Sequence, residues 1–408
     1  MNTEKCADPV VHDRHTGVMH HASAPLWVVF GLAMGPAVAL GFGRFAYALL
    51  LPAMRPELGW SFADAGAMNT ANAVGYLAGA WLAAPMGKKF GDKRVFAAGL
   101  LATALAVGAV GLTAHFMTLL ALRLAAGFSG AVAFVAGAGL TSAAAAGGSK
   151  NRAPIWLGIY FSGAGMGVAV SALALAPLLD SIGWRGAWLA LGALSLLATG
   201  SGALALRRAP AAARPPAHGA PTWSPRFMAR TLCAYTLYGA GYIAYATFII
   251  AFLRDGQGLN SGQISVFWSI VGFASVAAAF LWGPVIGRLP GGAGTACIIA
   301  LVAIGAAVPL LWSGPAAAYL SALLFGGSFL AVIASVTAFA RKATPQRDWT
   351  AAIAALTVAF GIGQCVGPVL SGMVSDGASG MRAGLWLSVV MLRAAAVVAA
   401  SQGEPPRS

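Results

Sequence analysis

The strongest constraint on the fold of this chain is a succession of long apolar segments. A helix of about 20 mainly apolar residues crosses a bilayer, and twelve segments of that kind follow one another along the sequence. Helices are expected because open sheet edges and lipid-facing loops cannot satisfy their backbone hydrogen bonds in hydrocarbon. The predicted spans are residues 26–51, 63–86, 95–113, 116–141, 154–179, 187–206, 228–252, 264–287, 294–312, 316–340, 350–374 and 383–401.

The composition agrees with an all-α membrane protein. Of the 408 residues, 59% are hydrophobic and 9% are charged, whereas a soluble domain carries about 25% charged residues. The excess of 25 basic over 11 acidic residues could suggest a nucleic-acid partner. However, the basic residues lie between the apolar segments, so membrane topology explains them better, and no nucleic-acid partner is expected.

The basic residues also predict the orientation of the chain. If the N-terminus is cytoplasmic, the cytoplasmic segments hold eighteen Lys and Arg residues and the outer segments hold four. Such a bias is typical of cytoplasmic loops. We therefore expect a multi-pass inner (plasma) membrane protein with both termini in the cytoplasm. The four outer residues are Arg55, Arg185, Arg254 and Arg382.

Two halves of the chain resemble each other. The pattern G-x-G-x-x-A-Y-A occurs at residues 41–48 and again at 239–246, and Gly163-Ala164-Gly165 matches Gly361-Ile362-Gly363 at the same spacing. A shared spacing predicts two six-helix halves in parallel repeat, as secondary transporters have.

The predicted domains follow from this repeat. A linker rich in Ala, Pro and Arg separates the halves. The expected segments are a disordered cytoplasmic tail at 1–24, an N-terminal half at 25–206, a cytoplasmic linker at 207–227 and a C-terminal half at 228–408.

Several short motifs resemble those of the major facilitator superfamily. Lys89-Phe90-Gly91-Asp92-Lys93-Arg94 keeps the basic-x-Gly core of its loop motif, although Lys88 and Ala84 depart from it. Arg123-x-x-x-Gly127-x-x-Gly130 is similar to its second motif. Two further segments resemble the YbfB/YjiJ-type branch of this superfamily. They are residues 41–52 and Gly361-Ile362-Gly363-Gln364-x-x-Gly367-Pro368. The resemblance implies a twelve-helix transporter, with Asp92, Lys93 and Arg94 as candidate gating or coupling residues.

Two arginines lie inside predicted spans. A cation at mid-helix costs about 2.5–3.5 kcal/mol on insertion scales, so it marks a candidate functional site. Arg44 in the first span and Arg123 in the fourth both fall roughly 10 Å inside the outer boundary. Together they could bind an anionic group, most simply a carboxylate. Alternatively, Arg44 snorkels to the interface and Arg123 bonds backbone carbonyls.

Aromatic and amide side chains could complete a substrate site. Tyr47 follows Arg44 on the first span, and Gln364 lies in the eleventh span. The tyrosines of the seventh span share one helix face, which would offer a wall to an amphipathic or aromatic substrate; helix packing is the alternative. These residues are Tyr235, Tyr238, Tyr242 and Tyr245.

Asp64 is the acidic residue nearest to a span interior. It could pair with Arg44 or Arg123 and carry a coupling proton. The pattern Ser61-x-x-Asp64 before an apolar run instead favours a capping box.

The pattern as a whole indicates a secondary transporter of a small organic solute, anionic or amphipathic. A transport-inactive sensor or structural protein on the same scaffold is the alternative. The sequence shows no catalytic constellation and no nucleotide-binding motif, so we expect no enzyme activity or cofactor. The histidines His12, His15, His20 and His21 could bind a metal, but a disordered tail is the preferred interpretation, so no metal is expected. The expected partners are the bilayer, the solute and a coupling proton or ion, with no required protein partner.

Overall fold

A computed structural model describes residues 25–146, 152–210, 226–286 and 289–404. The predicted tail at 1–24 and most of the predicted linker at 207–227 lie outside the described residues. The described part of the chain is helical and contains no strand. The N-terminal elements are α1 (Leu26–Pro36), η1 (Ala37–Phe45), α2 (Tyr47–Glu57), α3 (Phe62–Phe90), α4 (Asp92–Ala109), η2 (Val110–Leu112), α5 (Phe116–Ala146) and α6 (Arg152–Leu206).

The C-terminal elements follow the same order of long helices. They are α7 (Ala229–Ala251), η3 (Phe252–Gly256), α8 (Ser261–Leu281), α9 (Gly283–Ile286), α10 (Ala293–Leu311), α11 (Pro315–Gly326), α12 (Phe329–Ala343), η4 (Gln346–Asp348), α13 (Trp349–Ser375) and α14 (Gly380–Ala400).

The twelve predicted spans are confirmed as helical segments, with differences of detail. The α6 segment holds two spans that meet at Gly183, where a positive φ of 64° allows the chain to turn. The first span runs through α1, η1 and α2, and the tenth is divided between α11 and α12. Such interruptions are tolerated in a membrane where protein buries the backbone.

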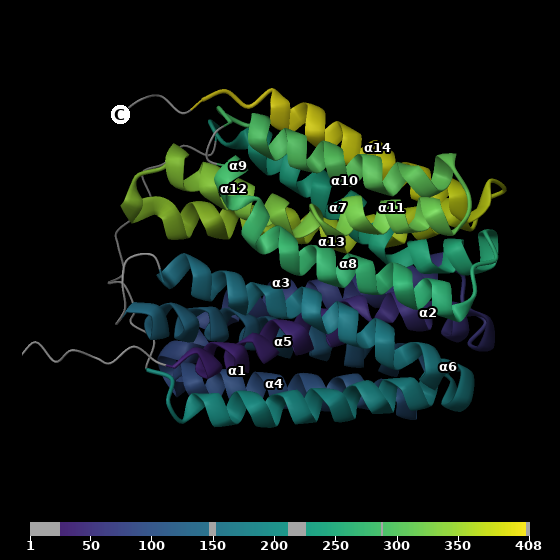
Figure 1. Cartoon of the computed structure of the whole chain (residues 1–408), viewed down its shortest axis with the longest axis horizontal. Helices are drawn as coiled ribbons and strands as arrows, with labels where there is room; N and C mark the ends of the chain where they lie inside the picture. The colour runs from purple at the N-terminus through teal and green to yellow at the C-terminus, as the bar shows by residue number, and fades with distance from the viewer. Residues whose placement is uncertain (1–24, 147–151, 211–225, 287–288, 405–408) are drawn as a thin grey trace, which may run out of the picture.

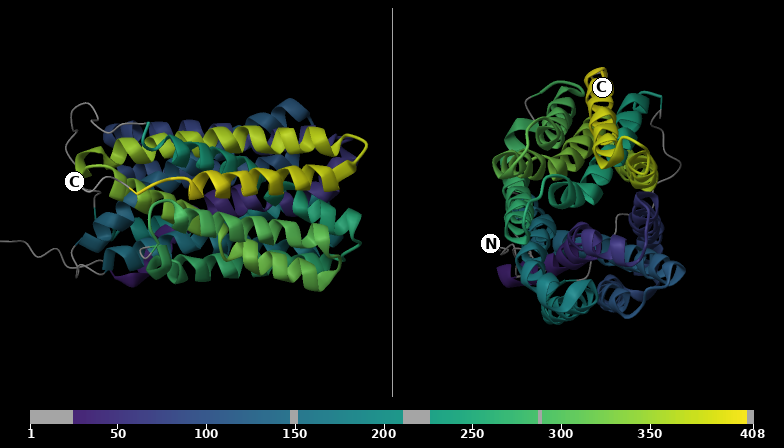
Figure 2. Two further views of the ribbon diagram at one scale, coloured as in Figure 1. Left: turned by 90° about the horizontal axis from the view of Figure 1, so that it is seen from above. Right: turned by 90° about the vertical axis from the view of Figure 1, so that its right-hand side faces the viewer.

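The helices form two bundles that face each other. Figure 1 shows α1–α6 in the lower bundle and α7–α14 in the upper bundle, and the end-on view in Figure 2 shows the same division. The bundles meet where α3 packs against α13, α6 against α8 and α2 against α7. Any site between the bundles is therefore lined by these helices and by η1, which precedes α2.

A different turn between helices marks each end of the molecule. The α2–α3 end holds the turn at Leu58–Ser61, and the α3–α4 end holds the turn at Gly91. In Figure 1 the α2–α3 end lies at the right.

Hydrogen bonds join the bundles near the α2–α3 end. The Asp376 carboxylate, at the end of α13, accepts from the backbone N–H groups of Phe62 (2.7 Å) and Ala63 (2.9 Å), which open α3. Asn69 donates to Thr247 of α7 at 2.5 Å, and Thr70 donates to the Cys365 carbonyl of α13 at 2.7 Å. The bundles are thus closed on each other over the first turns of α3.

Glycines allow the closest helix crossings. A Cβ atom at Gly41 of η1 would lie 2.5 Å from Cα of Gly167 in α6, and its repeat partner Gly239 of α7 would meet the Phe360 carbonyl oxygen of α13 at 2.6 Å. The two halves therefore use matching glycines to pack the first span of each half against the fifth.

We expect Gly41→Ala to destabilise the protein by about 1–3 kcal/mol, because the added methyl group overpacks a crossing against backbone atoms. The matched control is Gly200→Ala on α6, where an added Cβ meets nothing within 4 Å. Thermal unfolding in detergent measures both. Equal midpoints for the two variants would contradict the tight crossing.

Candidate functional site

Arg44 lies where the two bundles meet. It belongs to η1, a π-helical segment in which the Ala46 N–H bonds the Gly41 carbonyl at 3.0 Å. π-Helical turns inside α-helices occur frequently at functional sites. The side chain is only 3% exposed, so its charge is held inside the protein and does not reach an interface with water.

The guanidinium of Arg44 has N–H groups that form no hydrogen bond with the described residues. Its Nε and Nη2 atoms are buried and have no hydrogen-bond partner among the described residues. The group lies over the ring of Tyr76 in α3, 5.6 Å from the centroid. Phe45, the next residue of η1, meets Phe329 of α12 with 5.7 Å between the ring centroids, so this part of η1 lies against the opposite bundle. Nε–H and Nη2–H form one edge of the planar fork, the geometry that binds a carboxylate through two parallel bonds.

Arg123 is engaged differently. Arg123 belongs to α5. Its Nη1 donates to the Gly43 carbonyl at 2.5 Å, and its Nε approaches the Met68 carbonyl at 3.5 Å. The guanidinium lies between the rings of Tyr47 (4.9 Å) and Trp188 (5.7 Å). Only Nη2 lacks a partner in the described structure. The predicted alternative, an arginine bonded to backbone carbonyls, is therefore observed, with one donor left over.

The glycines after Arg123 explain its position. A Cβ at Gly127 would lie 2.0 Å from the Asn72 carbonyl oxygen, and one at Gly130 would lie 3.1 Å from the Cβ of Ala39 in η1. Because these positions have no side chain, α5 approaches both α3 and η1. That approach brings the Arg123 side chain within reach of the Gly43 carbonyl.

Polar side chains of α3 face the same region. Asn69 donates to Thr247, and Asn72 donates to the Arg123 carbonyl at 3.1 Å. Their Oδ1 atoms are buried without a donor among the described residues. With Tyr76 they occupy positions i, i+3 and i+7 of α3, which lie on one helix face. Tyr76 is a site candidate that the sequence analysis missed, although this spacing could have revealed it.

Aromatic rings line the opposite bundle. The ring of Phe360 in α13 stacks on Tyr235 (4.6 Å between centroids), Tyr242 (5.5 Å) and Tyr238 (6.0 Å). Tyr242 also stacks on Phe329 of α12 at 6.0 Å. We call these five residues the aromatic stack. Phe329 and Phe360 carry no polar signal, so nothing in the sequence alone selects them.

The hydroxyls of four of the predicted tyrosines are bonded inside the protein. Tyr238 donates to the Phe329 carbonyl, and Tyr245 pairs with Ser321 at 2.6 Å. Tyr47 donates to the Ala65 carbonyl at 2.9 Å. The Tyr242 hydroxyl accepts from Gln364 at 2.5 Å, which brings the predicted Gln364 beside a residue that Arg44 also influences. These bonds show that Tyr47, Tyr238 and Tyr245 have structural roles, whatever else they touch.

The capping interpretation of Asp64 is confirmed. Its carboxylate accepts from the Ser61 backbone N–H at 3.0 Å and from the Ser61 hydroxyl at 2.8 Å, while the Ser61 side chain accepts from the Asp64 N–H. Asp64 therefore closes the start of α3 and forms no ion pair with Arg44 or Arg123 in this structure.

The other predicted gating residues lie far from Arg44. Asp92, Lys93 and Arg94 open α4 directly after Gly91, whose φ is 86°. Tyr76 contacts Arg44, and Asp92 follows sixteen residues later, so roughly 20 Å of helix separates the two places. The structure does not bring these residues to the arginine site.

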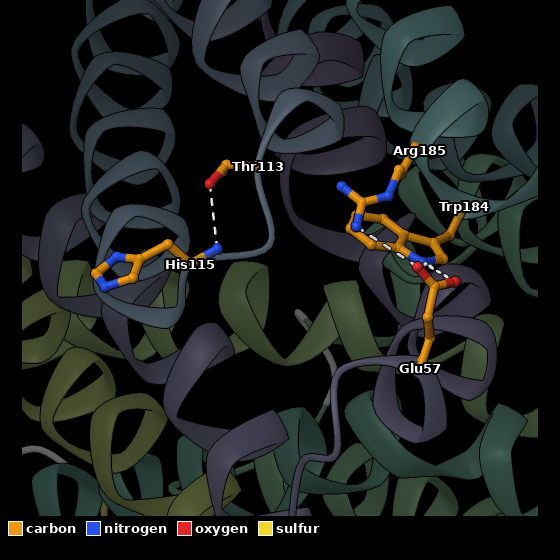
Figure 3. Close-up of polar contacts among 5 residues, drawn as sticks. All are labelled: Glu57, Thr113, His115, Trp184 and Arg185. Carbon is orange, nitrogen blue, oxygen red and sulfur yellow. Dashed lines mark hydrogen bonds and ion pairs between the residues drawn. The ribbon is translucent and has the colours of Figure 1, made fainter.

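At the α2–α3 end, polar contacts tie α2 to the turn of α6 (Figure 3). Glu57 accepts from the Trp184 indole N–H at 2.8 Å and forms an ion pair with Arg185 at 3.5 Å. Both charged side chains are about half exposed, so the pair adds little stability. In the same view the His115 N–H donates to the Thr113 hydroxyl at 3.1 Å. These contacts belong to two turns, one within α6 and one before α5, and lie apart from the buried arginines.

Comparison with known protein families shows which family the chain belongs to. The family described as "Uncharacterised MFS-type transporter YbfB" matches residues 36–400. The chain belongs to this family of the major facilitator superfamily. This YbfB-type protein is thus a membrane transporter and not an enzyme. No curated protein sequence matches it significantly.

Solved transporter structures share its fold. A point mutant of the nucleoside transporter NupG has a TM-score of 0.72 at 14% identity, covering 93% of this chain and 99% of the other. A bacterial homologue of the human lysosomal transporter Spinster, in an inward-facing and occupied conformation, has a TM-score of 0.71 at 16% identity, covering 91% and 95%. At these identities the likeness concerns the fold alone.

Because the two arginines are bonded differently, we expect their replacement to change the stability of the protein differently. Arg44→Met should leave the unfolding midpoint of the YbfB-type protein unchanged or raised, because an apolar side chain replaces a buried charge whose Nε and Nη2 have no hydrogen-bond partner among the described residues. Arg123→Met should lower the stability by about 1–3 kcal/mol, because buried carbonyls lose their donor. Arg393→Met, at an exposed position of α14, is the control. Equal losses at Arg44 and Arg123 in thermal unfolding would contradict this assignment.

Proposed function

We propose that this protein is a secondary active transporter that carries a small organic anion, amphipathic or aromatic, across the bacterial inner membrane. The observation that carries the proposal is the Nε–Nη2 edge of Arg44, buried between the bundles without a protein acceptor among the described residues. A buried charge is retained where it is paired or functional. A carboxylate of the solute is the simplest partner for that edge.

Other side chains would bind the rest of the solute. Nη2 of Arg123 offers a second donor, while Oδ1 of Asn69 and of Asn72 could accept from a hydroxyl or N–H of the solute. The aromatic stack, which includes Tyr242 beside Gln364, offers apolar surface from the other bundle. Such a mixture of mainly apolar walls with a few placed polar groups is typical of small-molecule sites.

The charge of the two ends supports the proposed orientation. Among the described residues, the α2–α3 end holds Arg55, Arg185, Arg254 and Arg382, whereas basic residues are more numerous at the α3–α4 end. By the positive-inside rule the α3–α4 end is cytoplasmic. Residues 1–24 are then a cytoplasmic tail, and 207–227 link the halves at 25–206 and 228–408 on that side. The basic residues of the α3–α4 end are Lys88, Lys89, Lys93, Arg94, Arg207, Arg208, Arg226, Arg230, Arg341, Lys342 and Arg347.

In an alternating-access cycle, the bonds between the bundles would close one end of the protein. In the proposed orientation the contact of Asp376 with Phe62 and Ala63 closes the outer end. Rocking of one bundle against the other must break it to admit solute from outside. The same two bundles supply Arg44 and the aromatic stack from opposite sides, so closure around the solute brings both onto it.

Binding tests the proposed site directly. Carboxylates of matched size, with and without an aromatic ring, are screened for thermal stabilisation of the purified protein against the corresponding amides and amines. Stabilisation by carboxylates should be lost in Arg44→Gln and kept in Arg393→Gln. Stabilisation by amines alone would exclude an anion site.

Transport separates a carrier from a transport-inactive sensor. Proteoliposomes should take up the carboxylate that stabilises best, and Arg44→Gln should reduce the rate by about 100-fold or more, since a charge-assisted bidentate contact of roughly 3 kcal/mol is lost. Binding to the wild-type protein without any uptake would favour the sensor.

A further inference from the structure

The membrane interior of this protein offers, within the described residues, no carboxylate or imidazole that could carry a proton. All the acidic side chains described lie within three residues of a helix end or beyond it, counting the turn of α6 at Gly183 as such an end, and the described histidine, His115, lies in the turn before α5. The acidic residues are Glu57, Asp64, Asp92, Asp180, Asp255, Asp348, Asp376 and Glu404. Glu4, Asp8 and Asp13 precede the first span in the sequence, outside the described residues.

The groups around Arg44 confirm this for the site itself. The titratable and charged groups near Arg44 are Tyr76 of α3, whose ring centroid lies 5.6 Å away, Arg123 of α5, Tyr242 of α7 and Cys365 of α13. Phenols and thiols hold their protons at neutral pH, and a guanidinium keeps its charge. None of these groups cycles between charged and neutral forms under working conditions, so the site cannot compensate the charge of Arg44 by itself.

An unpaired guanidinium affects the reorientation of the anion-loaded protein and of the empty protein differently. With an anion bound, the charge is paired while the bundles rock, and the pair moves as a neutral unit. Without an anion, the same movement must carry a buried unpaired cation through the closed state. Breaking a buried ion pair by removing one partner is strongly unfavourable, so the empty protein should reorient on the order of 100-fold more slowly than the loaded protein.

We propose that the protein is an obligatory exchanger of organic anions at Arg44. An anion bound from one side is released only in return for a second anion bound from the other side. The outward gradient of one organic anion then drives the uptake of another, with equal charge moved in each direction when the two carry the same charge. This inference rests on the proposed function, because it requires an anion at Arg44.

Counterflow in proteoliposomes tests the exchange. The probes are radiolabelled terephthalate, 4-hydroxybenzoate and malate, supplied outside vesicles that either contain the same unlabelled anion or contain buffer alone. Protein-free vesicles correct for leakage. For at least one probe we expect uptake at least tenfold faster into the loaded vesicles, and a change of less than twofold when an uncoupler collapses the proton gradient.

The outcomes distinguish this inference from the proposed function. Equal initial rates into loaded and buffer-filled vesicles would overturn exchange and leave anion transport standing. Uptake into buffer-filled vesicles driven by an inward proton gradient would also overturn it. Failure of all three anions to enter either kind of vesicle would count against the proposed function, and exchange would fall with it.

Two variants sharpen the result. Arg44→Gln removes the charge that forbids empty reorientation, so any residual transport by this variant should lose its dependence on internal anion. Arg393→Gln, which changes an exposed arginine of α14, should keep the full dependence. A residual flux of Arg44→Gln that still required internal anion would show that another group enforces exchange.

Discussion

The bond from Arg123 to the Gly43 carbonyl is the interaction on which the arrangement of the site depends. It ties α5 to η1 across the N-terminal bundle, and Arg44 is the next residue along the chain. In a low-dielectric interior a charged donor on a backbone carbonyl is worth more than a neutral pair. One arginine is thereby committed to backbone, and the other is left with an edge of donors directed between the bundles. Two cations that look alike in the sequence thus differ in their bonding in the structure.

The sequence predicts most of the fold because its signals are local. Apolar length gives the spans, and the recurrence of Gly41 as Gly239 gives the repeat, whose packing the structure shows in both halves. The capping box at Ser61–Asp64 depends on four consecutive residues, and it forms. Arg44 is found because a charge in an apolar segment is costly.

What the sequence leaves out depends on which helices become neighbours. Nothing near Tyr238 indicates that its hydroxyl meets the Phe329 carbonyl, and nothing near Phe360 indicates that it stacks on three tyrosines of α7. The π-helical geometry of η1 is also invisible, because apolar residues surround it on every side and give no periodic signal. The assignment of Asn69 and Tyr76 to the arginine site likewise needs the relative rotation of α3 and η1, which only packing determines.

The bonds between Asp376 and the start of α3 lie at an exposed part of the molecule. When they break, water can take the place of each partner, so neither the carboxylate nor the two N–H groups is left unsatisfied. Exposure to water should therefore bring the net gain from each of these bonds below the roughly 1.5–3 kcal/mol typical of hydrogen bonds to charged groups. Among the bonds that join the bundles at this end, the Asp376 contact is thus the one that water replaces most easily, whereas the bond from Asn69 to Thr247 is buried. In the proposed transport cycle the two arrangements of the bundles have to be close in free energy, and a bond whose partners are exposed to water adds little to the difference between them.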